Sequence, residues 1–220
     1  MKLPLPEELD LAQALRYLGC GQAGEAQLAA LRPWVGALKQ AAAPRGAVRL
    51  IRMDQLPPGL LQGRDIRRHL RGCGQCLLFA VTLGNGVDAL LRRLMAVDMA
   101  GAAAADALAS ALAEQVCDAY EQRLRAHCMA QGLWLSGRYS PGYGDWPLEV
   151  QPLLCRLADT QRAIGLCPSP GGLLTPLKSV TAVLGVSDGP QGGAPKPGCA
   201  HCAQRDSCIY RKRGTSCEKG

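Results

Sequence analysis

The chain has 220 residues, of which 48% are hydrophobic, so it is long enough for one domain or two small ones and can bury a core. Its longest apolar run without a charge, residues 76–83, is far shorter than the roughly 20 residues that cross a bilayer, which excludes a membrane span. The formal net charge of +7 would suit nucleic acid, but aromatic residues make up only 4% and leave few platforms on which single-stranded bases could stack.

The cysteines and the first residues indicate the compartment. The start of the chain turns acidic before an apolar segment can form, so we expect no secretory signal peptide. Eleven cysteines are an odd number that fits a disulfide framework poorly, and in a protein that is not exported they favour free thiols or metal ligands. We therefore expect a cytoplasmic protein.

Hydrophobic periodicity predicts most of the elements. In the first half we expect helices at residues 9–18 and about 25–40, a strand at 47–53, a short basic helix at 65–71 and a strand at 76–83. Pro33 would interrupt or kink the second helix. The strand at 76–83 is apolar except for Thr82, which is typical of a central strand buried on both faces.

The second half continues with a glycine turn and further helices. We expect a helix near residues 87–95, the longest helix at 102–129, a short apolar stretch at 133–135, a loop at 136–146, a helix from Pro152 to about 164, and a strand with one polar face at 177–186. The predicted fold class is α+β, with a mixed or antiparallel central sheet flanked by helices. We divide the chain into a body (1–187), a Gly/Pro linker (188–198) and a small cysteine-rich tail (199–220).

One loop, residues 138–147, combines groups that can bind a flat anionic ligand. Arg138 offers a fork for a carboxylate or phosphate, Gly142 permits close backbone approach, and Tyr143 offers an aromatic face with a polar tip. The alternative from the residues alone is a well-packed turn in which Arg138 pairs with Asp145.

This loop, Arg-Tyr-Ser-Pro-Gly-Tyr-Gly-Asp-Trp-Pro, resembles the Arg-x-x-Pro-Gly-Tyr signature of the activation (reactivation) domain of cobalamin-dependent methionine synthase. Other segments are similar and follow in the same order. They are residues 15–19 near the start, 69–73 leading into 79–84, and 178–183 near the end. The resemblance spans about residues 10–187 and is nearest to the short, free-standing members of that family.

The resemblance implies a domain that binds S-adenosylmethionine and presents its methyl group to the cobalt of a corrinoid protein. One electron and that methyl group would return inactive cob(II)alamin to methylcobalamin. The protein would therefore work as a component of a cobalamin-dependent methyltransferase system. Its chemistry would rest on positioning and desolvation, while cobalamin supplies the reactivity.

The resemblance also assigns candidate ligand-binding residues. Matched by motif, Arg138, Ser140, Gly142 and Tyr143 occupy the nucleotide-binding loop, and Asp118 takes the place of an acidic residue on the long helix before it. Arg138 could then pair with the ligand's carboxylate, and Asp118 could attract its ammonium or sulfonium charge. The alternative for Asp118 is an ordinary place on a solvated helix face.

The tail holds a separate set of candidate ligands. Its cysteines have the spacing C-x2-C-x5-C-x8-C among glycines and basic residues, and they are Cys199, Cys202, Cys208 and Cys217. Four thiolates suit a tetrahedral zinc ion or an iron–sulfur cluster, and an unmetallated tail is the third possibility. Two lone histidines, His69 and His127, are expected to be ordinary surface or packing residues, and Cys76 is expected in the core.

Three functions are compatible with these features. The first is a reactivation domain that acts on a separate corrinoid methyltransferase or methionine synthase and receives electrons from a donor such as flavodoxin or ferredoxin. The partner is expected to be separate because the chain has no Asp-x-His-x-x-Gly motif for corrinoid binding. The second is a non-catalytic docking or assembly partner of a corrinoid protein. The third is a nucleic-acid binder with a zinc tail, which only the net charge of +4 in residues 190–220 supports.

Overall fold

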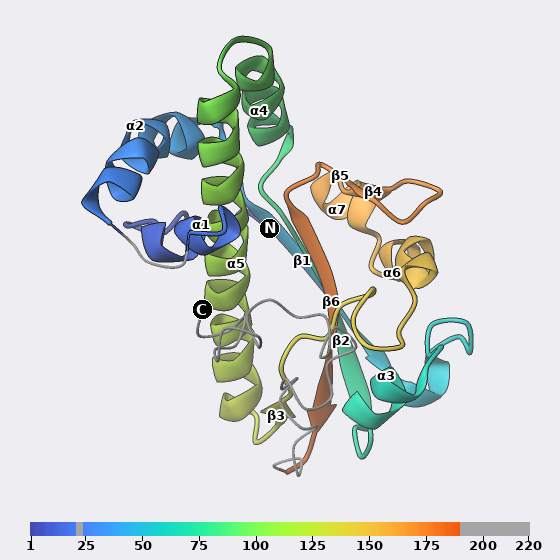
Figure 1. The fold of residues 1–220 in the computed structure, drawn as a ribbon. Coiled ribbons are helices and arrows are strands. Elements are labelled where there is room, and N and C mark those ends of the chain that lie inside the picture. Colours follow the sequence, from blue (N-terminus) through green and yellow to red (C-terminus); the bar gives the residue numbers. More distant parts are fainter. Residues whose placement is uncertain (21–23, 190–220) are drawn as a thin grey trace.

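The computed structural model describes residues 1–20 and 24–189. In that part of the chain an antiparallel sheet has the strand order β1-β2-β6-β3, and a small hairpin lies apart from it (Figure 1). The sheet strands are β1 (Arg45–Arg52), β2 (Gln75–Thr82), β6 (Ser179–Ser187) and β3 (Trp134–Leu135). The hairpin consists of β4 (Cys167–Pro168) and β5 (Leu174–Thr175).

On one face of the sheet α5 (Met99–Ala130) packs against the strands, and three further helices pack against α5. They are α1 (Leu11–Tyr17), α2 (Glu25–Ala41) and α4 (Asn85–Val97). Leu77 and Phe79 of β2 and Leu184 of β6 point to this face and share a core with Leu108 and Leu112 of α5. The long helix α5 ends beside β3, at the edge of the sheet next to β6 (Figure 1).

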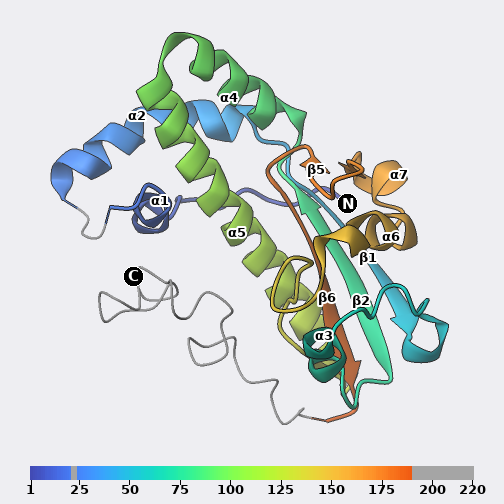
Figure 2. The same ribbon diagram turned by 45° about the vertical axis from the view of Figure 1, so that its right-hand side comes forward.

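Shorter helices cover the other face. They are α3 (Arg64–His69), α6 (Gln151–Leu157) and α7 (Thr160–Ile164), with 3-10 turns at Met53–Gln55 and Leu148–Val150. Leu78 of β2 and Val183 of β6 pack here against Ile66, Trp146 and Leu154. Figure 2 shows α5 on one side of the sheet and α6 and α7 on the other. None of the described helices has both the length and the apolar character needed to cross a membrane.

The predicted fold class is confirmed, and so are the central strand and the long helix. The sheet is antiparallel, and β2 is buried along nearly its whole length. The expected interruption of the second helix at Pro33 does not occur, since α2 continues through that residue. The divisions into linker and tail stay predictions, because residues 190–220 lie outside the described residues.

Two further local predictions are wrong, and one pair of short strands was not predicted. The helix expected from Pro152 to about residue 164 is two helices, because Asp159 has a left-handed φ of 51° that interrupts the helical hydrogen bonding. The polar face expected on the last strand is covered by the second layer, so that Thr181 is only 2% exposed. The hairpin of β4 and β5 was not expected, because strands of two residues have no periodicity to detect.

The buried hydroxyl of Thr181 gives a stability prediction. Its Oγ1 has no hydrogen-bond partner among the described residues, so Thr181→Val should leave the free energy of unfolding unchanged or raise it by up to about 1 kcal/mol. Thr160 is the matched control, because it is 1% exposed and donates to the Leu166 carbonyl at 2.7 Å. Thr160→Val should lower the same free energy by about 1 to 2 kcal/mol in urea unfolding. Equal losses in both variants would contradict the assignment.

Candidate functional site

The loop at residues 138–146 begins at the open edge of β6. Tyr139 exchanges two backbone hydrogen bonds with Val183, at 3.0 and 2.9 Å. Just before it, the Ser136 Oγ accepts the Gly185 N–H at 2.7 Å. Successive side chains of this extended segment point to opposite faces, so Tyr139 enters the core under α6 while Arg138 reaches toward α5.

Three carboxylates of α5 surround the Arg138 guanidinium. It donates to Asp118 at 2.6 Å, to Glu121 at 2.9 Å and to Glu114 at 3.4 Å. The Arg138 side chain is 15% exposed. Burial by itself would lower the pKa of Arg138, but the hydrogen bond to Asp118 and the nearby negative charges raise that pKa above its usual value, which keeps the guanidinium charged.

The structure therefore brings Asp118 and Arg138 together, although 20 residues separate them in the sequence. Asp118 is also on a solvated face, since 61% of its side chain is exposed and only one of its oxygens contacts Arg138. The alternative interpretation of the loop, in which Arg138 pairs with Asp145, is wrong. Asp145 instead accepts the backbone N–H groups of Arg64 and Asp65 at 2.8 and 2.9 Å, and these bonds lower the pKa of Asp145.

Glu114 and Glu121 were not among the candidates from the sequence. They lie four residues before and three after Asp118, so all three carboxylates share one face of the helix, and this spacing could have revealed them. Burial raises the pKa of Glu114, with Asp118 adding to the effect and Arg138 opposing it. Glu121 also accepts a hydrogen bond from Arg125 at 2.7 Å. The cluster therefore contains three carboxylates and two guanidinium groups.

The remaining predicted residues shape the tip of the loop. Gly142 has φ of +90°, a region that favours glycine, and it donates its N–H to the Trp146 carbonyl at 2.9 Å. The Ser140 carbonyl accepts the Tyr143 N–H at 3.3 Å. Tyr143 is 63% exposed, so its ring is accessible to a ligand, while the backbone around it is fixed by the turn.

An aromatic stack supports the loop from beneath. The ring of Tyr139 lies 5.1 Å from that of His69 and 5.9 Å from that of Trp146, measured between centroids. The indole N–H of Trp146 donates to the Leu60 carbonyl at 2.8 Å, and His69 Nε2 lies 3.1 Å from the Ser136 Oγ. His69 is thus a packing residue, as expected, and it links α3 to the loop.

Burial of His69 makes stability depend on pH. Burial lowers its pKa below the usual 6.5, so between these two pKa values the unfolded chain binds more protons than the folded protein. The contribution of His69 to the free energy of unfolding is fully present above pH 6.5. It is lost as the pH falls, with a slope of at most about 1.4 kcal/mol per pH unit. His69→Gln should remove this slope in urea unfolding between about pH 5.5 and 7.5. His127→Gln, at an exposed position, should retain it; a slope that survives in His69→Gln would contradict this origin.

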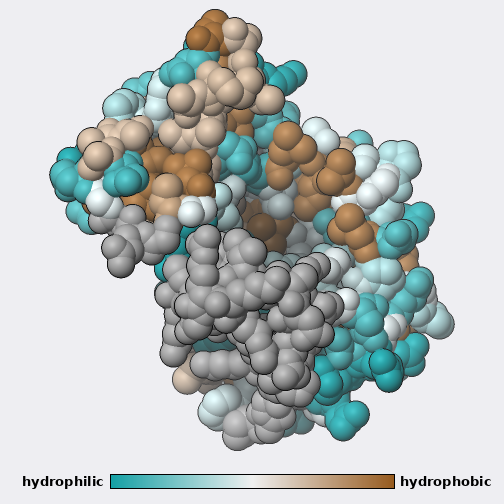
Figure 3. All heavy atoms as spheres, in the orientation of Figure 1, coloured by the Kyte–Doolittle hydropathy of each residue, from teal (hydrophilic) through white to brown (hydrophobic). Residues whose placement is uncertain are grey.

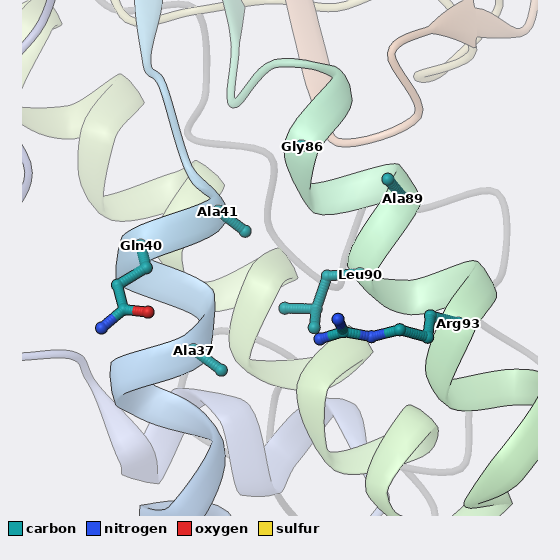
Figure 4. Close-up of a pocket in the computed structure, with 7 residues that line it drawn as sticks. All are labelled: Ala37, Gln40, Ala41, Gly86, Ala89, Leu90 and Arg93. Carbon is teal, nitrogen blue, oxygen red and sulfur yellow. The ribbon is translucent and has the colours of Figure 1, made fainter.

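Two other features are not part of this site. A shallow hollow of about 440 Å³ lies between α2 and α4, with Leu90 and Arg93 in its wall (Figure 4). In residues 1–20 and 24–189 no group of three or more His, Cys, Asp or Glu side chains is arranged so that it could hold a metal ion. The four tail cysteines predicted as metal ligands lie outside the described residues.

Comparisons with known proteins bear on the fold. No protein-family model matches the sequence, and no curated protein matches it. Among solved structures, the MetH reactivation domain bound to AdoHcy matches with a TM-score of 0.56 and 16% sequence identity, over 99% of this chain and 90% of that chain. At this identity the likeness concerns the fold alone. The chain therefore has the fold of the MetH reactivation domain, as the resemblance of its loop predicted.

Proposed function

We propose that the protein is an S-adenosylmethionine-binding reactivation domain that acts on a corrinoid methyltransferase carried by a separate chain. The observation that supports this most is the Arg138 loop, which faces three carboxylates of α5 in a fold shared with a domain solved with AdoHcy. AdoHcy is S-adenosylmethionine after loss of its methyl group. The proposal includes an electron donor, such as flavodoxin or ferredoxin, and a cytoplasmic location.

The charges at the site suit this ligand. S-adenosylmethionine carries a sulfonium, an ammonium and a carboxylate. Asp118 has an exposed carboxylate oxygen that can attract a cation, and Arg138 can pair with the ligand's carboxylate. The cluster contains three carboxylates and two guanidinium groups, so it has one more negative group than positive groups. This excess favours a ligand with a net positive charge.

The proposed reaction needs no side chain as a base. One electron from the donor reduces cob(II)alamin on the partner, and the reduced cobalt attacks the methyl carbon of the sulfonium. The carbon–sulfur bond breaks, its electron pair stays on sulfur, and neutral AdoHcy remains. Residues of this chain would orient the ligand and exclude water, which are the contributions that matter for a displacement at carbon.

A second candidate is a non-catalytic docking or assembly partner of a corrinoid protein. One observation favours it: the ion pairs within the protein already satisfy Arg138, so the guanidinium has no need of a ligand.

Calorimetric titration distinguishes the two. Wild-type protein should bind both S-adenosylmethionine and AdoHcy. Asp118→Asn should weaken the binding of S-adenosylmethionine by about tenfold and the binding of AdoHcy by less, because AdoHcy lacks the sulfonium charge. Asp159→Asn, at an exposed ion pair on the other face, is the matched control and should change neither affinity. Absence of both heat and thermal stabilisation at about millimolar ligand would contradict the first candidate and leave the second.

A further inference from the structure

Four arginines form a stripe along α3 and the turn after it. Arg64, Arg67, Arg68 and Arg71 follow the spacing i, i+3, i+4 and i+7, which places them on one face of a helix. Backbone bonds from Leu70 to Ile66 and from Arg71 to Arg68 extend the helical path to the last of them. The opposite face of α3 is buried. We call the four residues the arginine surface; Figure 3 shows a hydrophilic area where α3 lies.

Only part of this positive charge is neutralised. The Arg64 side chain is 98% exposed and lies 3.8 Å from Asp145, and Arg68 pairs with Asp65 at 2.7 Å. Arg67 donates to the Leu61 carbonyl. Within the part of the chain that the structure describes, no carboxylate lies within 4.0 Å of the basic groups of the other two arginines, Arg67 and Arg71.

The segment that contains the arginine surface carries the excess positive charge of residues 1–189. Residues 49–75 contain six arginines and two aspartates, whereas the rest of residues 1–189 contains thirteen basic and fourteen acidic side chains. Like charges three and four residues apart destabilise a helix by a few tenths of a kcal/mol per pair. A short helix with such pairs is less stable than it could be, and a negatively charged partner would remove the repulsion.

Contacts to the candidate loop hold the arginine surface in place. Asp145 accepts the first two backbone N–H groups of α3, and Trp146 donates to Leu60 just before that helix. A Cβ on Gly63 would come within 2.6 Å of the Asp145 carbonyl oxygen, so the two segments are in close contact. The arginine surface and the loop therefore form one structural unit.

We propose that the arginine surface docks an acidic surface of a partner protein beside the Arg138 loop. This inference goes beyond the proposed function, since it does not require ligand binding. Guanidinium groups recognise carboxylates in bidentate fashion, and steering by opposite charge speeds association. Single-stranded nucleic acid fits less well, because none of the exposed aromatic residues of the described chain, Tyr17, Trp134 and Tyr143, belongs to residues 49–75, which carry the arginines.

The probe for this proposal is a fluorescent peptide of about twelve glutamates, measured by anisotropy with the full chain at about 20 mM salt. The triple variant R64E/R67E/R71E should bind the peptide about tenfold more weakly than wild type. The matched control R93E/R123E/R162E makes the same change of charge at exposed positions elsewhere and should alter binding by less than about threefold. Since both variants keep the basic residues after 189, the comparison isolates the arginine surface.

Several results would overturn the proposal. They are equal losses in the two triple variants, no binding of the peptide by wild type, or tighter binding of a duplex DNA of similar charge through the same arginines at physiological salt. If the glutamate variant melts below wild type, R64Q/R67Q/R71Q replaces it, and a weakening of about threefold is expected. Titration with AdoHcy separates this result from the proposed function, because R64E/R67E/R71E should bind AdoHcy as wild type does.

Discussion

Trp146→Ala should lower the free energy of unfolding by about 3 to 5 kcal/mol, the range for removal of a large buried aromatic side chain. Trp146 is 1% exposed and packs in the core beneath the sheet, stacked against Tyr139 and bonded to Leu60. Its loss creates a cavity and leaves the Leu60 carbonyl without its donor. Urea unfolding followed by circular dichroism measures the change.

The matched control is Trp134→Ala. Trp134 lies on β3 with 45% of its surface exposed, so its replacement should cost less than about 1 kcal/mol. If the two variants unfolded at similar urea concentrations, Trp146 would not be the anchor of the loop.

Arg138→Ala should lower the free energy of unfolding by about 2 to 4 kcal/mol, because it leaves the half-buried carboxylates of α5 facing one another. The pair with Glu121 is the most protected, with side-chain exposures of 15% and 16%. Arg162→Ala removes an exposed ion pair with exposures of 89% and 51% and should change stability by less than about 0.5 kcal/mol. Arg138→Lys should recover part of the loss, since it restores the charge without the fork.

The same variant addresses the ligand. Under the proposed function, Arg138→Ala loses a charge-assisted hydrogen bond of about 1.5 to 3 kcal/mol, so the dissociation constant for S-adenosylmethionine should rise about 10- to 150-fold. The measurement uses temperatures at which the variant is still folded. Unchanged affinity in a folded Arg138→Ala protein would place the ligand away from this loop.

The elements that could be predicted from the sequence are those with long, regular patterns. The run at 76–83 is apolar because β2 is covered by helices on both faces, and α5 is long enough for its periodicity to be clear. The break at Asp159 could not be predicted, since its left-handed backbone leaves no strong signal in the sequence. The polar face assigned to the last strand was wrong because burial depends on the layer that covers it, and that layer comes from other segments.

The candidate site could be predicted only in part. The motif located Arg138 and Asp118, and the structure brings them into contact, but the roles of Glu114 and Glu121 required the helix face to be known. The supports of the loop are beyond sequence reasoning. Asp145 and Arg64 lie 81 residues apart, and Trp146 and Leu60 lie 86 apart, so no local pattern connects them.

The hydrogen bonds that fix the loop also bear on the entropy of ligand binding. Tyr139, Gly142, Asp145 and Trp146 are each hydrogen-bonded within the protein, so most of the backbone ordering has occurred during folding. A ligand at this loop would therefore lose little affinity to ordering of the chain, and its association would not wait for a slow rearrangement. Substitutions that loosen these supports would weaken binding through added freedom of the unbound loop, even where the altered side chain never touches the ligand.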